Sequence, residues 1–231
     1  MLRLVGFLAL AVVLAALLGH VPLIGPLFRH TGILGILLAA AILSALVTRM
    51  GGRLLAGRKL KAELRALSAV GNPHGHGKIG ALYLSRGRPR AALAHLEEAA
   101  AGEPDVAEWQ YRLGLARLAV RELDPALAAF ERCVALEEEH AYGAAQIRRA
   151  ECLQRLGRHE AALEALAVFE RNHGSSPEAA YRRGVALRAL GRRDEARAAF
   201  REVGELARRA TRYQRREAGL WALRAGLARI V

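Results

Sequence analysis

The apolar residues of this chain of 231 residues are concentrated at its beginning. Residues 4–18 and 31–48 contain no charged side chain, and the first run stays largely apolar as far as Ile24. A helix that crosses a bilayer needs roughly 20 apolar residues in succession. The pattern therefore predicts a transmembrane helical hairpin over residues 1–48, with a tight turn at residues 25–30.

A cleaved signal peptide is the alternative for the first apolar run, because Arg3 precedes it. However, no clear Ala-x-Ala cleavage site follows, and a second apolar run comes at once. We therefore expect both spans to be retained and the protein to be an integral membrane protein. A composition rich in Ala, Leu and Arg is associated with bacterial proteins, so the predicted location is a bacterial cytoplasmic membrane.

Basic residues are concentrated after the second apolar run, at Arg49, Arg53, Arg58, Lys59, Lys61 and Arg65. Only Glu63 opposes them, and the turn between the two runs carries Arg29 alone. Because basic residues close to a span favour the cytoplasmic side of a membrane, we expect the rest of the chain to lie in the cytoplasm. A periplasmic location, as in a factor for cell-envelope assembly, is the alternative.

Residues 49–70 form a basic connector next to the predicted membrane segment. Leu60, Leu64 and Leu67 recur there at helical spacing, which predicts a short amphipathic helix from Arg58 onward. Three roles remain open for this helix. It could rest its basic side chains on anionic lipid headgroups, serve only to set the topology, or cap the folded part that follows.

A second pattern, with a period of about 34 residues, extends over residues 73–210. Small residues recur at steps of 34, 36 and 34 positions, at Gly80, Gly114, Ala150 and Gly184. An alanine lies twelve residues after each of them, and a bulky residue lies four residues after that alanine. These pairs are Ala92 and Leu96, Ala126 and Phe130, Ala162 and Leu166, and Ala196 and Phe200. Such a period is typical of stacked helix pairs, in which small residues let helices approach and large residues fill the remaining space.

The pattern resembles that of the tetratricopeptide repeat family over about 60% of the chain. The best match is the first unit, with Ile79-Gly80, Tyr83, Ala92, Leu96, Ala99 and Pro104. The second unit departs at Cys133 and Glu138, and the third has Arg149-Ala150 in place of Leu-Gly. The resemblance implies an all-α fold, an α-solenoid over residues 71–231. Its repeats are expected at residues 73–106, 107–140, 143–176 and 177–210, followed by a capping helix at residues 211–231.

The expected capping helix has one apolar face, formed by Leu220, Leu223 and Leu227. Repeat arrays need a terminal cap whose outer face is polar. We therefore expect this helix to close the array, with Trp221 packed on the fourth unit.

Composition and motifs indicate no enzymatic site. The two cysteines are isolated, so no disulfide framework is expected, and Cys133 falls at a core position of the second unit, which predicts a buried thiol. Residues 71–80 lack the glycine and the hydroxyl of a phosphate loop and are expected to form a loop that opens the first repeat helix. His74 and His76 have no third metal ligand nearby. We predict a protein without catalytic residues, metal or cofactor.

The family resemblance implies that the first helix of each pair lines a concave groove that receives a segment of a partner protein. The position expected to face this groove is basic in every unit: Lys78, Arg112, Arg148 and Arg182. Tyr111 and Tyr181 occupy a neighbouring groove position, and Arg155 and Arg188 add further charge. Guanidinium groups bind carboxylates in pairs of hydrogen bonds, and tyrosine offers rigid contact area. These residues predict a groove that binds an acidic segment.

Nucleic-acid binding is the competing interpretation of the charge, because the chain has 35 basic and 22 acidic residues and a formal net charge of +13. Residues 182–201 carry seven arginines, and the expected capping helix adds more to this basic C-terminal region. Glu195 lies among the seven arginines and Glu202 directly follows them. No nucleic-acid-reading motif appears, so this interpretation is the weaker one. The predicted function is a membrane-anchored adaptor, and the sequence leaves the partner and the homo-oligomeric state open.

Overall fold

The computed structural model describes residues 41–50, 62, 64–65, 67–68 and 71–230. The chain divides into two compact units, Met1–Arg65 and Ala66–Val231. Most of the predicted hairpin lies outside the described residues, as do Arg53, Arg58, Lys59 and Lys61 of the predicted membrane-surface set.

In the first unit, residues 41–50 are helical and include Arg49. Large apolar side chains, among them Ile42, Leu46 and Val47, are exposed along this helix. Arg65 is also helical. In the part of the chain that the structure describes, no helix combines the length and the apolar character that crossing a membrane requires.

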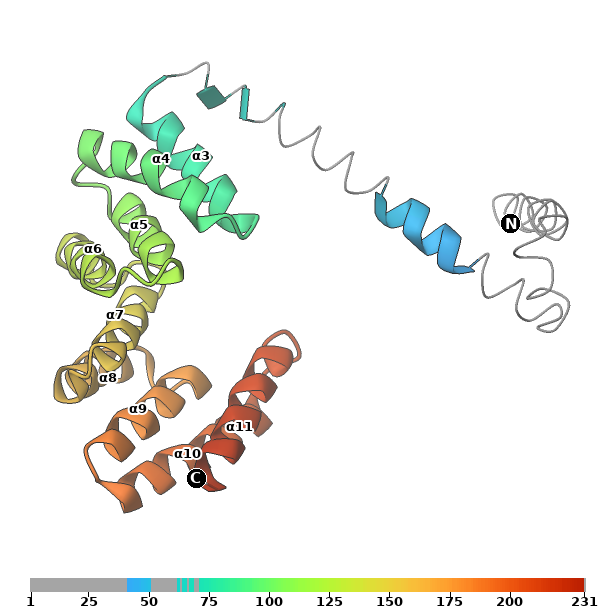
Figure 1. Cartoon of the computed structure of the whole chain (residues 1–231). Coiled ribbons are helices and arrows are strands. Elements are labelled where there is room, and N and C mark those ends of the chain that lie inside the picture. The colour runs from blue at the N-terminus through green and yellow to red at the C-terminus, as the bar shows by residue number, and fades with distance from the viewer. Residues whose placement is uncertain (1–40, 51–61, 63, 66, 69–70, 231) are drawn as a thin grey trace, which may run out of the picture. The chain divides into compact units, whose positions relative to one another are not determined.

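The second unit is all-helical in its described residues (Figure 1). Its helices are α3 (Pro73–Ser85), α4 (Pro89–Gly102), α5 (Ala107–Ala119), α6 (Leu123–Leu136), α7 (Ala144–Arg155), α8 (His159–His173), α9 (Pro177–Ala189), α10 (Arg193–Arg209) and α11 (Arg215–Ile230). Each range expected to form a repeat contains two of these helices, and α11 lies in the range expected to form the cap.

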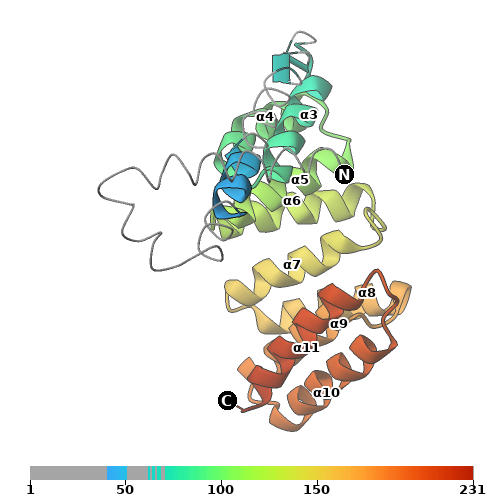
Figure 2. The ribbon, with the colours of Figure 1, turned by 90° about the vertical axis from the view of Figure 1, so that its right-hand side faces the viewer.

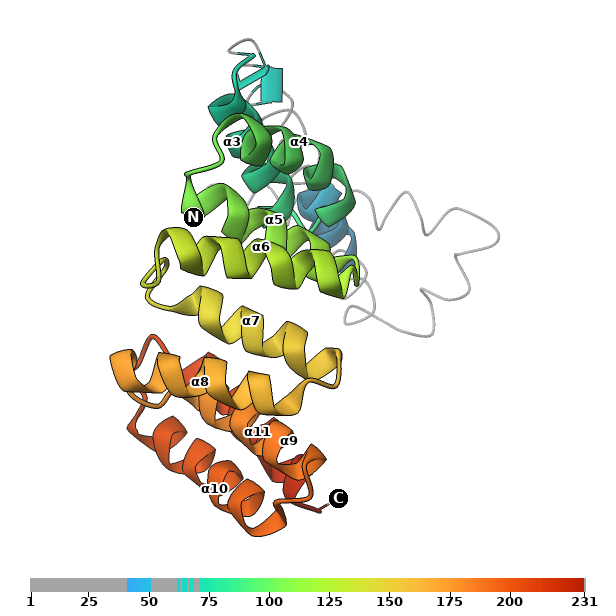
Figure 3. The same ribbon diagram turned by 90° about the vertical axis from the view of Figure 1, so that its left-hand side faces the viewer.

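Each helix of the second unit packs mainly against its neighbours in the chain (Figures 2 and 3). Helices α3 and α4, α5 and α6, α7 and α8, and α9 and α10 form pairs, and the second helix of each pair contacts the first helix of the next. The first helices also contact one another in succession. Because packing between neighbouring units defines a solenoid, the predicted all-α solenoid is confirmed.

The recurrent small and bulky residues meet within each pair. A Cβ atom added at Gly114 would lie 2.6 Å from Cε1 of Phe130, and one added at Gly184 would lie 2.6 Å from Cε1 of Phe200. Gly80 lies equally close to Leu96. These glycines therefore allow the two helices of a pair to approach until the large side chain fills the space between them.

Helix α3 begins earlier than the sequence pattern suggests. The side-chain Oδ1 of Asn72 accepts a hydrogen bond from the backbone N–H of Gly75 at 2.7 Å, and Pro73 occupies the first turn. A side-chain acceptor at the cap followed by proline is a strong helix start. Residues 73–80, which we expected to be a loop, are therefore the first turns of α3.

The third pair differs from the others at its beginning, where the period is two residues longer. Ala141, Tyr142 and Gly143 all have positive φ angles, 51°, 56° and 72°, in the turn that leads into α7. The turn leaves Tyr142 88% exposed, whereas Gly143 is packed against the side chain of His173. The two additional residues are thus accommodated in this turn and not inside a helix.

The expected buried thiol is confirmed. Cys133 and Cys152 are both fully buried, each in the packed interior between helices. Burial raises the pKa of each thiol to about 12, because the thiolate would lose its hydration. Both cysteines are free, as two isolated thiols in different core clusters must be.

Candidate partner-binding surfaces

Three of the arginines expected in the groove form one ion cluster between α7 and α9. Arg182 donates to Glu151 at 2.6 Å and to Glu178 at 2.7 Å. Arg148 donates to the same two carboxylates, at 2.6 and 2.8 Å. Arg155 reaches Glu151 at 2.7 Å. We call these five residues the α7–α9 ion cluster.

The cluster is largely shielded from water. Arg182 and Glu151 are each 8% exposed. Burial alone would raise the pKa of Glu151, but the charges of Arg182, Arg148 and Arg155 outweigh it and lower this pKa below its ordinary value. Two carboxylates therefore offset the charge of two of the three guanidinium groups. The surplus charge is most accessible at Arg155, whose side chain is 47% exposed.

Arg112 is paired in the same manner, with Glu108 one turn earlier on α5. Glu108 also contacts Nε2 of His140 at 2.9 Å, while Nδ1 of His140 lies 2.9 Å from Glu137. The expected groove arginine of the second unit thus belongs to a network that includes the turn before α7. Lys78 differs from it, since it is exposed and has no ion pair among the described residues.

The two groove tyrosines pack into the interior between units. Tyr111 is half-buried beside Phe130 and His140, and burial raises its pKa. Tyr181 contacts both Phe200 and Trp221. Its ring centroid lies 5.8 Å from that of Phe200 and 5.3 Å from that of Trp221. Trp221 therefore packs on the fourth pair, as expected.

Helix α11 packs against the residues of the fourth pair that were expected to line the groove. Arg182 lies over the ring of Trp221 at 5.7 Å, and Arg188 donates to the carbonyl of Ala228 at 3.0 Å. Tyr181, Arg182 and Arg188 are thus engaged by α11 within the chain itself.

The arginines expected to give the groove its charge are therefore mostly paired, and its two tyrosines pack against neighbouring aromatic rings. The structure brings Arg148, Arg155 and Arg182 together and pairs them with the acidic side chains of Glu151 and Glu178. The sequence contains a signal for such pairs, because an acidic residue precedes an arginine by four positions on the same helix at Glu108–Arg112, Glu151–Arg155 and Glu178–Arg182. Binding of a partner by these residues stays a prediction.

The outer side of α11 differs from the expected polar cap. Ala218 and Ala225 are buried against the array, whereas Leu220, Leu223 and Leu227 are 55%, 63% and 61% exposed. Gly219 and Gly226 lie on the same side, and a Cβ atom added to either would meet no other atom within 4 Å. We call Gly219, Leu220, Leu223, Gly226 and Leu227 the α11 outer face.

The arginines around α11 are not neutralised as those of the groove are. Residues 205–229 contain seven arginines and only two acidic residues, Glu205 and Glu217. Within the described chain none of these arginines forms an ion pair, and Arg224 instead lies over the ring of Trp221 at 4.6 Å. In contrast, Arg182, Arg183, Arg192 and Arg197 of the arginine-rich segment 182–201 all pair with acidic side chains.

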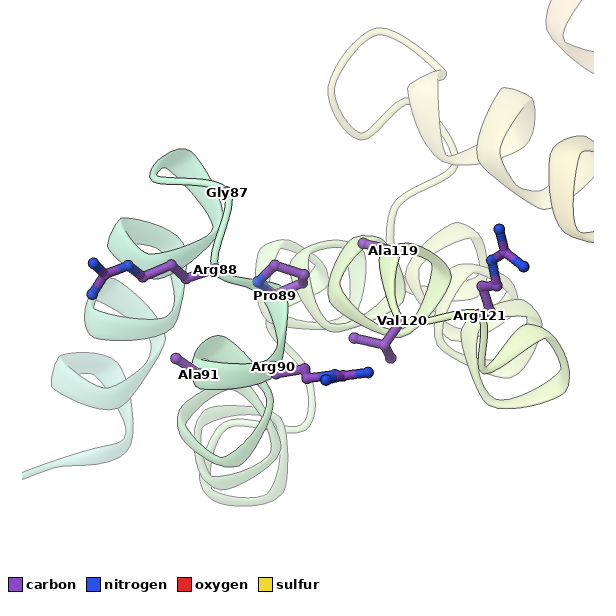
Figure 4. A pocket seen from close by; sticks show the side chains of 8 residues that line it. All are labelled: Gly87, Arg88, Pro89, Arg90, Ala91, Ala119, Val120 and Arg121. Carbon is purple, nitrogen blue, oxygen red and sulfur yellow. The ribbon is translucent and has the colours of Figure 1, made fainter.

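A hollow of about 550 Å³ lies between the turn joining α3 to α4 and the turn joining α5 to α6 (Figure 4). Arg88, Arg90 and Arg121 surround it. Figure 4 shows Arg88 and Arg121 extending in different directions, so the guanidinium groups do not converge on one point. The hollow lacks the arrangement that an anion site requires.

The histidines at the start of α3 make local contacts. Nδ1 of His76 lies 3.3 Å from Nδ1 of His95 on α4, and Nδ1 of His74 lies 3.4 Å from Glu103. Burial and the neighbouring His76 lower the pKa of His95. Among the described residues, no group of three metal-ligating side chains comes together.

Comparison with known proteins identifies the architecture. A family model described as tetratricopeptide repeat matches residues 78–144 and 147–210, more than half of the chain. A crystal structure of MamA is 26% identical, with a TM-score of 0.59 over 65% of this chain and 87% of that one. MamA from Desulfovibrio magneticus RS-1, residues 41 to the end, is 20% identical, with a TM-score of 0.52 over 66% of this chain and 92% of that one. This second likeness bears on the fold alone. Comparison with curated proteins gives no significant match. The chain belongs to the tetratricopeptide repeat family.

Proposed function

We propose that this protein is a membrane-anchored scaffold that holds a partner protein through its tetratricopeptide repeats. The observation that carries the proposal is the unbroken stack of four helix pairs, α3 to α10, with the small-against-large packing of the family. A tetratricopeptide fold indicates a protein-interaction scaffold, because stacked helix pairs create the extended concave surfaces with which repeat proteins bind other molecules.

Anchoring rests on residues 1–48. Two uncharged runs of this length are typical of membrane spans. Six basic residues follow the second run, which favours a cytoplasmic location for the repeats. A tether of this kind raises the concentration of the partner near the membrane without a catalytic step.

Within residues 182–201, the ion pairs favour a scaffold over nucleic-acid binding. Four of the seven arginines in residues 182–201 contact acidic side chains within the chain. A phosphate backbone would have to compete with these carboxylates, which weakens the electrostatic attraction on which such binding depends.

The proposal is tested by isolating the full chain from native membranes after reversible crosslinking. We expect one partner protein to be recovered in constant proportion, and to be lost when residues 73–230, which form α3 to α11, are exchanged for an unrelated helical array. A reporter fused after Val231 tests the topology, since activity of a cytoplasmic reporter is expected. Recovery of no partner, or only of nucleic acid, would contradict a scaffold. Activity of a periplasmic reporter would instead support the envelope-assembly alternative.

A further inference from the structure

The α11 outer face is an apolar surface that the fold does not use. Ala218, Trp221 and Ala225 hold α11 against the array, whereas Leu220, Leu223 and Leu227 point away from these contacts and are more than half exposed. No described residue of the second unit covers the three leucines. Large apolar side chains in line on one helix face are typical of a surface that binds another molecule.

The two glycines on this face indicate what kind of molecule it is. Glycine weakens a helix relative to alanine, and neither Gly219 nor Gly226 has a neighbour that would exclude a side chain. Small residues seven positions apart, beside leucines, let the backbone of a second helix approach closely while the leucines pack around it. A lipid surface has no need of such glycines.

The charges around the face indicate the chemistry of that helix. Arg216 and Arg224 lie one turn before and one turn after Leu220, and neither pairs with an acidic side chain among the described residues. A second copy of α11 would bring the same arginines opposite these, so like charges would repel. Acidic residues along the edges of a partner helix would instead meet them favourably.

We propose that the α11 outer face docks an amphipathic helix of a partner protein, whose apolar side packs on Leu220, Leu223 and Leu227 and whose edges are acidic. The inference rests on the proposed scaffold function and locates its binding surface. It moves the acidic partner predicted from the sequence away from the groove, where Arg112, Arg148 and Arg182 are paired with carboxylates, to the end of the array, where the arginines are not. Apolar anchors on one helix face are the usual basis of helix docking.

The test uses the full chain in lipid nanodiscs and a set of synthetic helical peptides. Each peptide carries leucines at three- and four-residue spacing, with glutamates along both edges, and matched peptides carry lysines instead. Peptide binding is measured by fluorescence anisotropy. We expect a glutamate-edged peptide to bind at least about tenfold more tightly than its lysine-edged counterpart, a clear difference on the scale of binding constants.

Three variants separate the proposal from its alternatives. Gly226→Leu adds bulk at a position where an added Cβ has no described neighbour within 4 Å beyond its own helix backbone, so the fold should be unchanged while binding weakens at least about tenfold. R216E/R224E should weaken binding to the same extent and reverse the preference between the two peptide classes. The matched double variant R90E/R132E makes the same change of charge at exposed arginines elsewhere and should leave binding unchanged.

Each other outcome would overturn the inference. If no glutamate-edged peptide binds, or if Gly226→Leu binds as the wild type does, no helix docks on this face. If Gly226→Leu increases association with anionic phosphatidylglycerol vesicles, a lipid surface covers the leucines. If the wild type dimerises and L223S/L227S does not, a second copy covers them. The scaffold function would survive all three results, provided that a partner is still recovered from membranes.

Discussion

Arg182 on α9 donates a hydrogen bond to Glu151 on α7 at 2.6 Å, across the boundary between the third and fourth helix pairs. Both side chains are almost completely buried. The same carboxylate also accepts hydrogen bonds from Arg148 and Arg155. A buried carboxylate with three partners fixes how α7 and α9, the first helices of the third and fourth pairs, lie against each other. This contact therefore couples neighbouring repeats.

Glu151→Gln should destabilise the array strongly. The substitution keeps the shape of the side chain but leaves Arg182 and Arg148 with one carboxylate fewer in a buried place. Breaking a buried pair by removing one partner costs about 3–5 kcal/mol. Urea unfolding followed by circular dichroism measures this loss. The control is Glu164→Gln on the exposed side of α8, for which a change within about 0.5 kcal/mol is expected.

The same cluster should make stability depend on pH in the acid range. The pKa of Glu151 is lower in the folded chain than its ordinary value of 4.5, so the unfolded state binds this proton more tightly. The contribution of Glu151 is therefore fully present above that ordinary value and is lost as the pH falls through the folded one. Unfolding free energies measured between neutral pH and the acid range should decline less steeply in Glu151→Gln than in the wild type. Parallel curves would show that the cluster does not titrate as described.

Two glycine substitutions should act in opposite directions. Gly184→Ala places a Cβ 2.6 Å from the ring of Phe200, so the pair must move apart at a cost of about 1–3 kcal/mol. Gly219→Ala meets nothing within 4 Å and should stabilise α11 by up to about 1 kcal/mol, because alanine is the better helix former. Thermal unfolding of both variants tests the contrast, and an equal shift in the two would contradict the packing described for the repeats.

Arg121 adopts a conformation that glycine adopts elsewhere in the array. Its φ angle is 70°, and the turns inside the other pairs have Gly87, Gly157 and Gly191 at φ angles of 66°, 76° and 77°. The left-handed conformation costs a residue other than glycine about 1–2 kcal/mol. Glycine avoids this cost, but part of the gain in stability is lost because the unfolded chain has more conformational freedom at glycine. Arg121→Gly should therefore stabilise the chain by up to about 1 kcal/mol, and Gly157→Arg should destabilise it by about 1–2 kcal/mol. Denaturant midpoints measure both changes.

Much of the repeat architecture could be predicted from the sequence because the period acts on every unit at once. Gly80, Gly114 and Gly184 recur where a large side chain must be received, at Leu96, Phe130 and Phe200. The start of α3 was misplaced because three glycines and a proline in residues 71–77 suggested a loop. In the structure, the side chain of Asn72 caps the helix by accepting a hydrogen bond from the backbone of Gly75, so α3 begins at Pro73.

The binding surface was harder to predict, because charge and exposure are properties of tertiary structure. Arg182 is basic in the sequence but nearly buried and paired in the structure, through Glu178 on its own helix and Glu151 on another. The leucines of α11 form an apolar stripe that a sequence pattern assigns to the core. In the structure the alanines Ala218 and Ala225 are buried instead, because they let α11 lie close to the fourth pair.

Site-specific photocrosslinking in intact membranes tests the central claim of a partner-binding scaffold most directly. A photoreactive residue is placed at Leu223 on the α11 outer face, at Lys78 on α3, or at Glu164 on α8 as a control. We predict one discrete protein adduct from Leu223, absent from the control position and abolished by R216E/R224E. An adduct from Lys78 alone would place the partner on the first helices and remove the inference about α11. The absence of any protein adduct from both Leu223 and Lys78 would contradict the scaffold itself.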